Sequence, residues 1–204
     1  DRDWSSDVCS SDLELDFGNQ KLTNVHILIL NSFATNWNGL KKLNLQNNSI
    51  SDEGSGIIGN NKNWGELEEL NLSSNQVGEK GCCAIGNNTT WVKLKKLDLS
   101  NNRIGDEGGV TIGKNNIWKD LHELYISSNS LSDRSAQAVG SNKIWKNLKK
   151  VVLSFNKISD EGGEILGKNS SWHLLEIFEC KKNMLGNKTA KALAANITWS
   201  CLKI

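Results

Sequence analysis

A period of 27 residues, kept without insertion or deletion over the last 165 residues, is the feature that most constrains this chain. Leucine recurs at positions 40, 67, 94, 121, 148, 175 and 202. Tryptophan recurs at 64, 91, 118, 145, 172 and 199, and asparagine at 48, 75, 102, 129, 156 and 183. A fixed period of this length predicts a solenoid, in which each unit packs only against its neighbours. A solenoid presents a long surface, so binding of another macromolecule is the first functional expectation.

The composition favours no strongly charged partner. The chain has 24 Lys and Arg against 23 Asp and Glu, so its net charge is +1. This balance argues against nucleic-acid and membrane partners, and no apolar run reaches the ~20 residues of a membrane helix. Five cysteines and three histidines occupy unrelated repeat positions, so we expect no metal site and no cofactor. The cysteine pattern favours a reducing, cytoplasmic location.

The two ends of the sequence look unlike an evolved protein. Residues 3–13 read DWSSDVCSSDL, a string that resembles one reading frame of a sequencing adapter. We therefore expect residues 1–13 to be a non-native artefact and residues 14–204 to be the repeat array, with six to seven units. The sequence stops three residues into a new repeat, which indicates an internal fragment of a longer metagenomic protein. A fragment without capping units is expected to self-associate.

Each unit opens with a strand pattern and continues with a helix pattern. In the unit that starts at position 94, Leu94, Leu97 and Leu99 alternate with polar residues, as in a half-buried strand whose leucines point inward. Residues 106–115 then read as a short helix. Asp106 is its expected N-cap and Gly113 its expected C-terminal stop.

Small residues inside the helix predict close packing between the two layers. Gly108 and Gly109 would let the helix lie close to the strands, while Ile104 and Ile112 would fill the space between. Six units precede the end of the sequence, and an earlier, degenerate unit near Glu14 is one residue longer.

The asparagine and tryptophan columns are predicted to be structural. After each strand the chain must turn inside a packed interior, where backbone groups have no sheet or helix partner. A buried asparagine can bridge such groups with two donors and one acceptor. The predicted bridging residues are Asn48, Asn75, Asn102, Asn129 and Asn156. The tryptophans expected to pack in the core between units are Trp64, Trp91, Trp118, Trp145 and Trp172.

The repeat motif resembles that of the leucine-rich repeat family. The family pattern LxxLxLxxNxI stands here as LKKLNLQNNSI (40–50), LEELNLSSNQV (67–77), LKKLDLSNNRI (94–104), LHELYISSNSL (121–131) and LKKVVLSFNKI (148–158). Unit length and the DEG helix are closest to the ribonuclease-inhibitor-like class. The resemblance implies an α/β fold, a right-handed horseshoe-shaped solenoid with a parallel inner sheet and outer helices.

The outward strand positions are the expected reading surface for a partner. At the third position of each unit, charges of opposite sign alternate, which predicts a ladder of solvated ion pairs along Lys42, Glu69, Lys96, Glu123 and Lys150. At the fifth and eighth positions, Tyr125, Val152 and Phe155 interrupt an otherwise polar sheet. An exposed aromatic and aliphatic patch is a candidate hot spot, and repeat drift is the alternative explanation. The predicted partner-binding residues are Tyr125, Val152, Phe155, Asp98, Glu123 and Lys150.

Three functions compete on these observations. The first is a non-enzymatic scaffold that binds a protein partner on the concave face of the sheet. The second is a substrate-recognition arm of a larger enzyme or sensor, such as a ubiquitin-ligase-type effector or a nucleotide-binding immune-type receptor, whose other domains are missing. The third is a repeat stretch without selected binding. The sequence itself holds no phosphate loop and no nucleophile elbow, so no catalytic residues are predicted.

Overall fold

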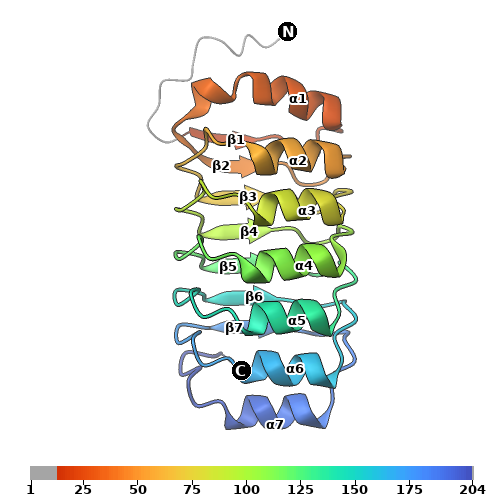
Figure 1. The fold of residues 1–204 in the computed structure, drawn as a ribbon, viewed down its shortest axis with the longest axis vertical. Helices are drawn as coiled ribbons and strands as arrows, with labels where there is room; N and C mark the ends of the chain where they lie inside the picture. Colours follow the sequence, from red (N-terminus) through yellow and green to blue (C-terminus); the bar gives the residue numbers. More distant parts are fainter. Residues whose placement is uncertain (1–12, 204) are drawn as a thin grey trace.

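One parallel sheet runs along the whole molecule in the computed structural model, which describes residues 13–203 (Figure 1). Its strands are hydrogen-bonded in chain order. They are β1 (Leu13–Asp16), β2 (Leu40–Asn44), β3 (Glu69–Asn71), β4 (Lys96–Asp98), β5 (Glu123–Tyr125), β6 (Lys150–Val152) and β7 (Ile177–Glu179). Because each strand lies one repeat from the next, residues 27 apart are register partners from β2 onward, as Leu70 and Leu97 are.

A second layer of helices covers one face of this sheet (Figure 1). The helices are α1 (Asn24–Ser32), α2 (Asp52–Asn60), α3 (Glu79–Gly86), α4 (Gly105–Lys114), α5 (Asp133–Gly140), α6 (Asp160–Gly167) and α7 (Asn187–Ala195), with the short 3-10 helix η1 (Ala34–Trp37) after α1. The predicted α/β solenoid is confirmed. The sheet is open and uncurled, and no helix of the described residues covers its other face. We call this uncovered side the open face.

The first repeat differs from the others in its register. Leu13 pairs with Leu40 and Glu14 with Lys42, so the register shifts by one residue there and β2 contributes the extra residue, Lys41. This register shift accommodates the longer first unit that the sequence predicts. Leu13 begins β1, whereas residues 1–12 of the segment interpreted as an artefact lie outside the described residues.

The core lies between the two layers and is filled by the periodic apolar residues. The side chains of Leu94, Leu97 and Leu99 are fully buried, as are those of Ile104 and Ile112. The tryptophan column is buried as well, at the turn from each helix to the next strand: Trp64, Trp91, Trp118, Trp145 and Trp172. Burial of this apolar surface is the main source of stability for a stack of short strands and short helices.

The asparagine column joins successive repeats through backbone groups. The Asn102 Nδ2 donates to the carbonyl oxygens of Leu72 at 2.9 Å and Leu99 at 3.0 Å. The backbone N–H of Val77, in the preceding repeat, donates to Asn102 Oδ1 at 2.9 Å. Each such side chain satisfies backbone groups that leave the strand ladder at the turn. Equivalent bonds are made by Asn48, Asn75, Asn129 and Asn156.

A second asparagine column supports the opposite edge, where each helix ends. The Asn88 Nδ2 donates to the carbonyl oxygen of Gly59, and its Oδ1 accepts the backbone N–H of Trp91. These side chains satisfy carbonyl groups at the end of the preceding helix and fix the tryptophan turn. The column comprises Asn61, Asn88, Asn115, Asn142, Asn169 and Asn196, again 27 residues apart.

Asp106 does not cap its own helix. It lies inside the first turn of α4, and its carboxylate accepts hydrogen bonds from the backbone N–H of Ser132 at 2.8 Å and the hydroxyl of Ser135 at 2.6 Å. Both partners belong to the start of the next helix, α5. The predicted N-cap role of Asp106 is therefore wrong: its carboxylate reaches the unpaired groups of the following repeat.

The helix glycines serve contacts between helices rather than the roles predicted for them. Gly113 is followed by Lys114 inside α4, so it does not end the helix. A Cβ atom at Gly113 would lie 2.5 Å from the backbone nitrogen of Val139 in α5. Gly108 faces Cys82 in α3 and Gly109 faces Ser135 in α5, so both contact neighbouring helices and not the strand layer. Helices normally need a wider spacing than strands, and this difference curves a solenoid. Close helix packing reduces the difference and therefore the curvature.

Charge alternates with a period of two repeats. At the second residue of the helix pattern, acidic and basic residues follow one another along Glu53, Lys80, Glu107, Arg134, Glu161 and Lys188. Ion pairs join Arg134 to Glu107 and Lys188 to Glu161, each at 2.7 Å. The second residue of each repeat unit shows a similar alternation: Lys95, directly before β4, pairs with Glu68, directly before β3, at 2.7 Å. Neighbouring repeats are thus electrostatically complementary.

Candidate binding face

The open face presents a ladder of charges along the sheet. Lys42 contacts Glu14 at 2.8 Å and Glu69 at 3.5 Å, and Lys96 contacts Glu123 at 3.8 Å. These side chains are about two-fifths exposed or more, so solvent screens each pair and its contribution to stability is small. The alternation predicted from the sequence therefore forms ion pairs that neutralise most of the N-terminal part of the face.

Tyr125 lies in the middle of this ladder with its polar group satisfied. Its hydroxyl donates to Glu123 Oε2 at 2.6 Å. The Nζ atoms of Lys96 and Lys150 lie 5.5 and 5.1 Å from the centre of its ring, within cation–π range. Burial, followed by the hydrogen bond to Glu123, raises the pKa of the Tyr125 hydroxyl, which stays neutral.

Asp98 is the register partner of Tyr125 on β4. Its carboxylate accepts the backbone N–H of Ser100 at 2.9 Å. Burial raises the pKa of Asp98, although the bonds from Ser100 act in the opposite direction. The structure thus brings together Asp98, Glu123, Tyr125 and Lys150, four of the six predicted binding residues.

Val152 departs from the prediction. It is the register partner of Tyr125 on one side and of Glu179 on the other. These neighbours cover it, so only 9% of its surface is exposed. The expectation that Val152 offers exposed apolar surface is wrong, because cross-strand neighbours shield a short side chain in the middle of a sheet.

Phe155 is the prominent apolar side chain of the face. It lies in the turn that follows β6, and 59% of its surface is exposed. Its backbone has a φ of 57°, in the left-handed region that disfavours bulky residues. The same turn position is left-handed in the neighbouring repeats, where small polar residues dominate: Asn47, Ser74, Asn101 and Ser128.

Four residues beside Phe155 were not selected by the sequence reasoning. The backbone N–H of Phe155 donates to the carbonyl oxygen of Lys181, and Lys182 occupies the left-handed position of the next repeat, with a φ of 56°. Two residues further along each repeat lie Lys157 and Met184, and Met184 is 61% exposed. Their signal was present in the sequence, because Lys182 follows Phe155 in a column of Asn and Ser, and Met184 is the one apolar residue in a column of polar residues from position 49 onward.

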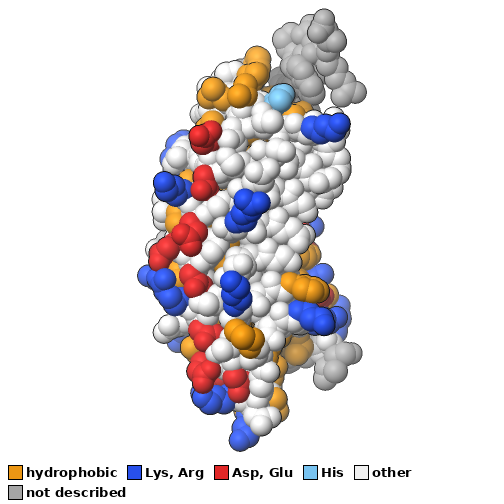
Figure 2. Space-filling view, turned by 90° about the vertical axis from the view of Figure 1, so that its right-hand side faces the viewer, with side chains coloured by type: hydrophobic (Ala, Val, Ile, Leu, Met, Phe, Trp, Pro, Cys, Tyr) orange, Lys and Arg blue, Asp and Glu red, His pale blue; other side chains and the backbone are white. Residues whose placement is uncertain are grey.

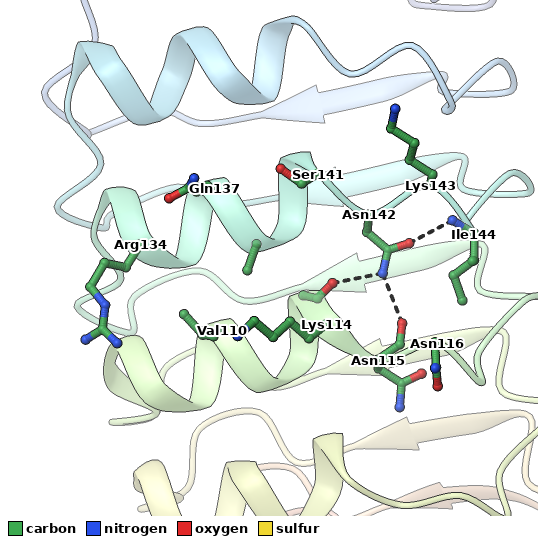
Figure 3. Close-up of a pocket in the computed structure, with 12 residues that line it drawn as sticks. Val110, Lys114, Asn115, Asn116, Arg134, Gln137, Ser141, Asn142, Lys143 and Ile144 are labelled. Carbon is green, nitrogen blue, oxygen red and sulfur yellow. Dashed lines mark hydrogen bonds between the residues drawn. The ribbon is translucent and has the colours of Figure 1, made fainter.

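A shallow groove also lies on the helical layer, away from the open face (Figure 3). It has a volume of about 570 Å³ and lies between α4 and α5. Asn142 at its floor donates to the carbonyl oxygens of Gly113 and Asn115 and accepts the backbone N–H of Ile144. The hydrogen-bonding groups of Asn142 are therefore used within the protein, and its role in this groove is structural.

The structure shows neither a metal-type cluster nor a membrane segment within residues 13–203. No group of three or more His, Cys, Asp or Glu side chains in this range is arranged around a common point that could hold an ion. None of the helices in the same range combines the length and the apolar character needed to cross a bilayer.

Comparison with known families supports the repeat assignment. The model of a family described as Leucine Rich repeat matches residues 40–54, 67–86, 92–113 and 146–167. Each matched segment contains a strand of the sheet and reaches into the helix that follows it. A comparison with curated proteins gave no match.

Proposed function

We propose that this chain binds a protein partner on its open face, because the leucine-rich repeat model matches segments in four of its repeats and such repeats generally mediate protein–protein interaction as non-enzymatic scaffolds. The 27-residue unit and the DEG helix support a place in the ribonuclease-inhibitor-like class. Six gaps between seven strands, at about 4.8 Å each, give a face about 29 Å long. This length suits a partner surface of roughly 800 Å².

The observation that carries this proposal is the conformation of Phe155. An exposed aromatic side chain at a φ of 57° is unfavourable for two reasons. It leaves apolar surface in water, and it places a bulky residue in the left-handed region. Residues held in unfavourable conformations are concentrated at functional sites. A large aromatic side chain in the strand-to-helix turn is also the type of residue that anchors protein interfaces.

The remainder of the predicted site would supply polar contacts around this anchor. Glu123, Lys150 and Asp98 are held in place by Tyr125 and Ser100 before a partner arrives, which lowers the entropic cost of binding. A net charge of +1 and the acidic residues that alternate with lysines support a protein rather than a nucleic acid or a membrane as partner. The same face would also serve a substrate-recognition arm of a larger enzyme or sensor.

A selection from a random peptide library displayed on phage tests the proposal. Peptides selected on the chain are synthesised and titrated against three proteins: the parent, Phe155→Asn and Ile197→Asn. Ile197 is 91% exposed and lies after α7, in a helix-to-strand turn, so its replacement removes apolar surface from the opposite edge. We expect binding to be lost in Phe155→Asn and kept in Ile197→Asn. If every selected peptide binds Phe155→Asn as tightly as the parent, the open face is not the binding site.

A further inference from the structure

Three lysines near Phe155 have no acidic partner. Within residues 13–203, the open-face lysines of the N-terminal part form ion pairs, and Lys150 lies over Tyr125. Lys157, Lys181 and Lys182 are exposed, and none of them forms an ion pair with any residue in that range. Three lysines without an ion-pair partner are therefore gathered in the two turns that follow β6 and β7.

These cations alternate with the two exposed apolar side chains of the same turns. Phe155 and Lys182 occupy equivalent left-handed positions in adjacent repeats. Lys157 and Met184 occupy the equivalent positions two residues later, and the backbone N–H of Met184 donates to the carbonyl oxygen of Ile158 at 2.8 Å. The result is a two-by-two arrangement in which an apolar side chain neighbours a lysine along the chain and across the repeats.

The carboxylates at the neighbouring helix starts are already engaged, while Glu179 on β7 forms no ion pair within residues 13–203. Asp160 accepts backbone N–H groups at the start of α7, and Glu161 pairs with Lys188 at 2.7 Å. Figure 2, which views the strand-to-helix edge, shows acidic side chains following one another along the molecule, and hydrophobic side chains beside lysine and arginine in its lower half. The uncompensated cations thus lie on the sheet side of this edge, where Phe155 and Met184 are exposed.

We propose that Phe155, Lys157, Lys181, Lys182 and Met184 form a docking patch for an acidic protein segment that carries an apolar anchor residue. The proposal rests on the proposed function and specifies the chemistry of the partner. Carboxylates of the segment pair with the three free lysines, while its apolar residue packs against Phe155 and Met184. The patch holds no arginine, and carboxylates follow the neighbouring helix starts, so a nucleic-acid backbone is a poorer match than an acidic peptide.

The repeat itself provides variants that fit the fold. Lys182→Asn places at this position the residue that Asn47 and Asn101 already provide with the same left-handed backbone. Lys157→Ser likewise copies Ser49 and Ser130 of other repeats. Lys114→Ser removes an exposed lysine of the helical layer as a matched control.

The experiment titrates the phage-selected peptides against these variants at low and high salt. We expect the peptides to be rich in Asp and Glu around one apolar residue. Lys157→Ser and Lys182→Asn should each weaken binding about fivefold, the effect of one exposed ion pair, and high salt should remove this difference. Lys114→Ser should bind like the parent.

Four outcomes would overturn the docking patch. Peptides that depend on Phe155 but are not acidic, or that ignore both lysine substitutions, would leave the proposed function intact and remove the acidic partner. A single-stranded oligonucleotide that competes more strongly than the acidic peptides would assign the patch to nucleic acid. A library that yields no Phe155-dependent binder would overturn the proposed function together with the patch.

Discussion

Asp160, in the first turn of α6, accepts the backbone N–H of Thr189, in the first turn of α7, at 2.8 Å. The same carboxylate accepts the backbone N–H groups of Gly186 and Lys188. The carboxylates of Asp52, Asp106 and Asp133 likewise accept backbone N–H groups at the start of the helix in the next repeat. A one-dimensional stack is stabilised by such interactions because it has only neighbour contacts to hold its units in register.

The cap predicts a loss of stability in acid. Hydrogen bonds from the Thr189 backbone hold the pKa of Asp160 at about 2, below its usual 3.8. Because the folded-state pKa is lowered, this stabilisation is present above about pH 4 and is lost as the pH falls towards 2. Asp160→Ala should lower the free energy of unfolding at neutral pH, and its difference from the parent should shrink between pH 4 and pH 2 in urea titrations. Asp120→Ala, at an exposed loop carboxylate, is the control; an unchanged difference across this range would contradict the capping role.

Asn102→Ala should destabilise the fold by about 1–3 kcal/mol. The substitution leaves the carbonyl oxygens of Leu72 and Leu99 and the N–H of Val77 without their partner inside the array. Asn116 is exposed in the same repeat and provides a matched control, for which a change within about 0.5 kcal/mol is expected. Chemical denaturation checks both values, and equal stability of the two variants would refute the bridging role.

Two glycine-to-alanine substitutions should change the stability of the fold in opposite directions. Gly113→Ala places a Cβ atom 2.5 Å from the Val139 backbone, which forces α4 and α5 apart at a cost of about 1–3 kcal/mol. Gly56 lies in α2 with no atom within 4 Å of such a Cβ atom, so Gly56→Ala should stabilise the helix by about 0.5–1 kcal/mol. Melting temperatures of the two variants should fall on opposite sides of the parent value. A shift in the same direction for both would show that helix contacts do not require Gly113.

Substitutions at the left-handed turn position test whether the backbone conformation of Phe155 is unfavourable for a bulky residue. Phe155→Asn should stabilise the protein by about 1 kcal/mol, since asparagine tolerates this backbone and removes exposed apolar surface. Asn101→Phe, at the equivalent position two repeats earlier, should destabilise it by a similar amount. Urea denaturation measures both, and a less stable Phe155→Asn variant would show that Phe155 contributes to packing.

The repeat period predicted the strands, the buried leucines and the position of the two layers, because a solenoid copies one local solution along the chain. It could not predict the direction of the Asp106 carboxylate, because the start of α5 is about one repeat away along the chain and becomes its neighbour only in the stacked fold. Val152 is buried by Tyr125 and Glu179, neighbours 27 residues away on either side. The charge alternation to which Glu107 and Arg134 belong is visible in the sequence only when every second repeat is compared, because neighbouring repeats carry opposite charges.

The most direct test of the central claim is to follow backbone amide chemical shifts of the isotope-labelled chain while a phage-selected peptide is added. The account predicts shifts concentrated in β6, β7 and the turns around Phe155 and Lys182, with little change in α2 to α5. Saturating shifts in the helical layer or in the helix-to-strand turns, with the Phe155 region unchanged, would contradict it.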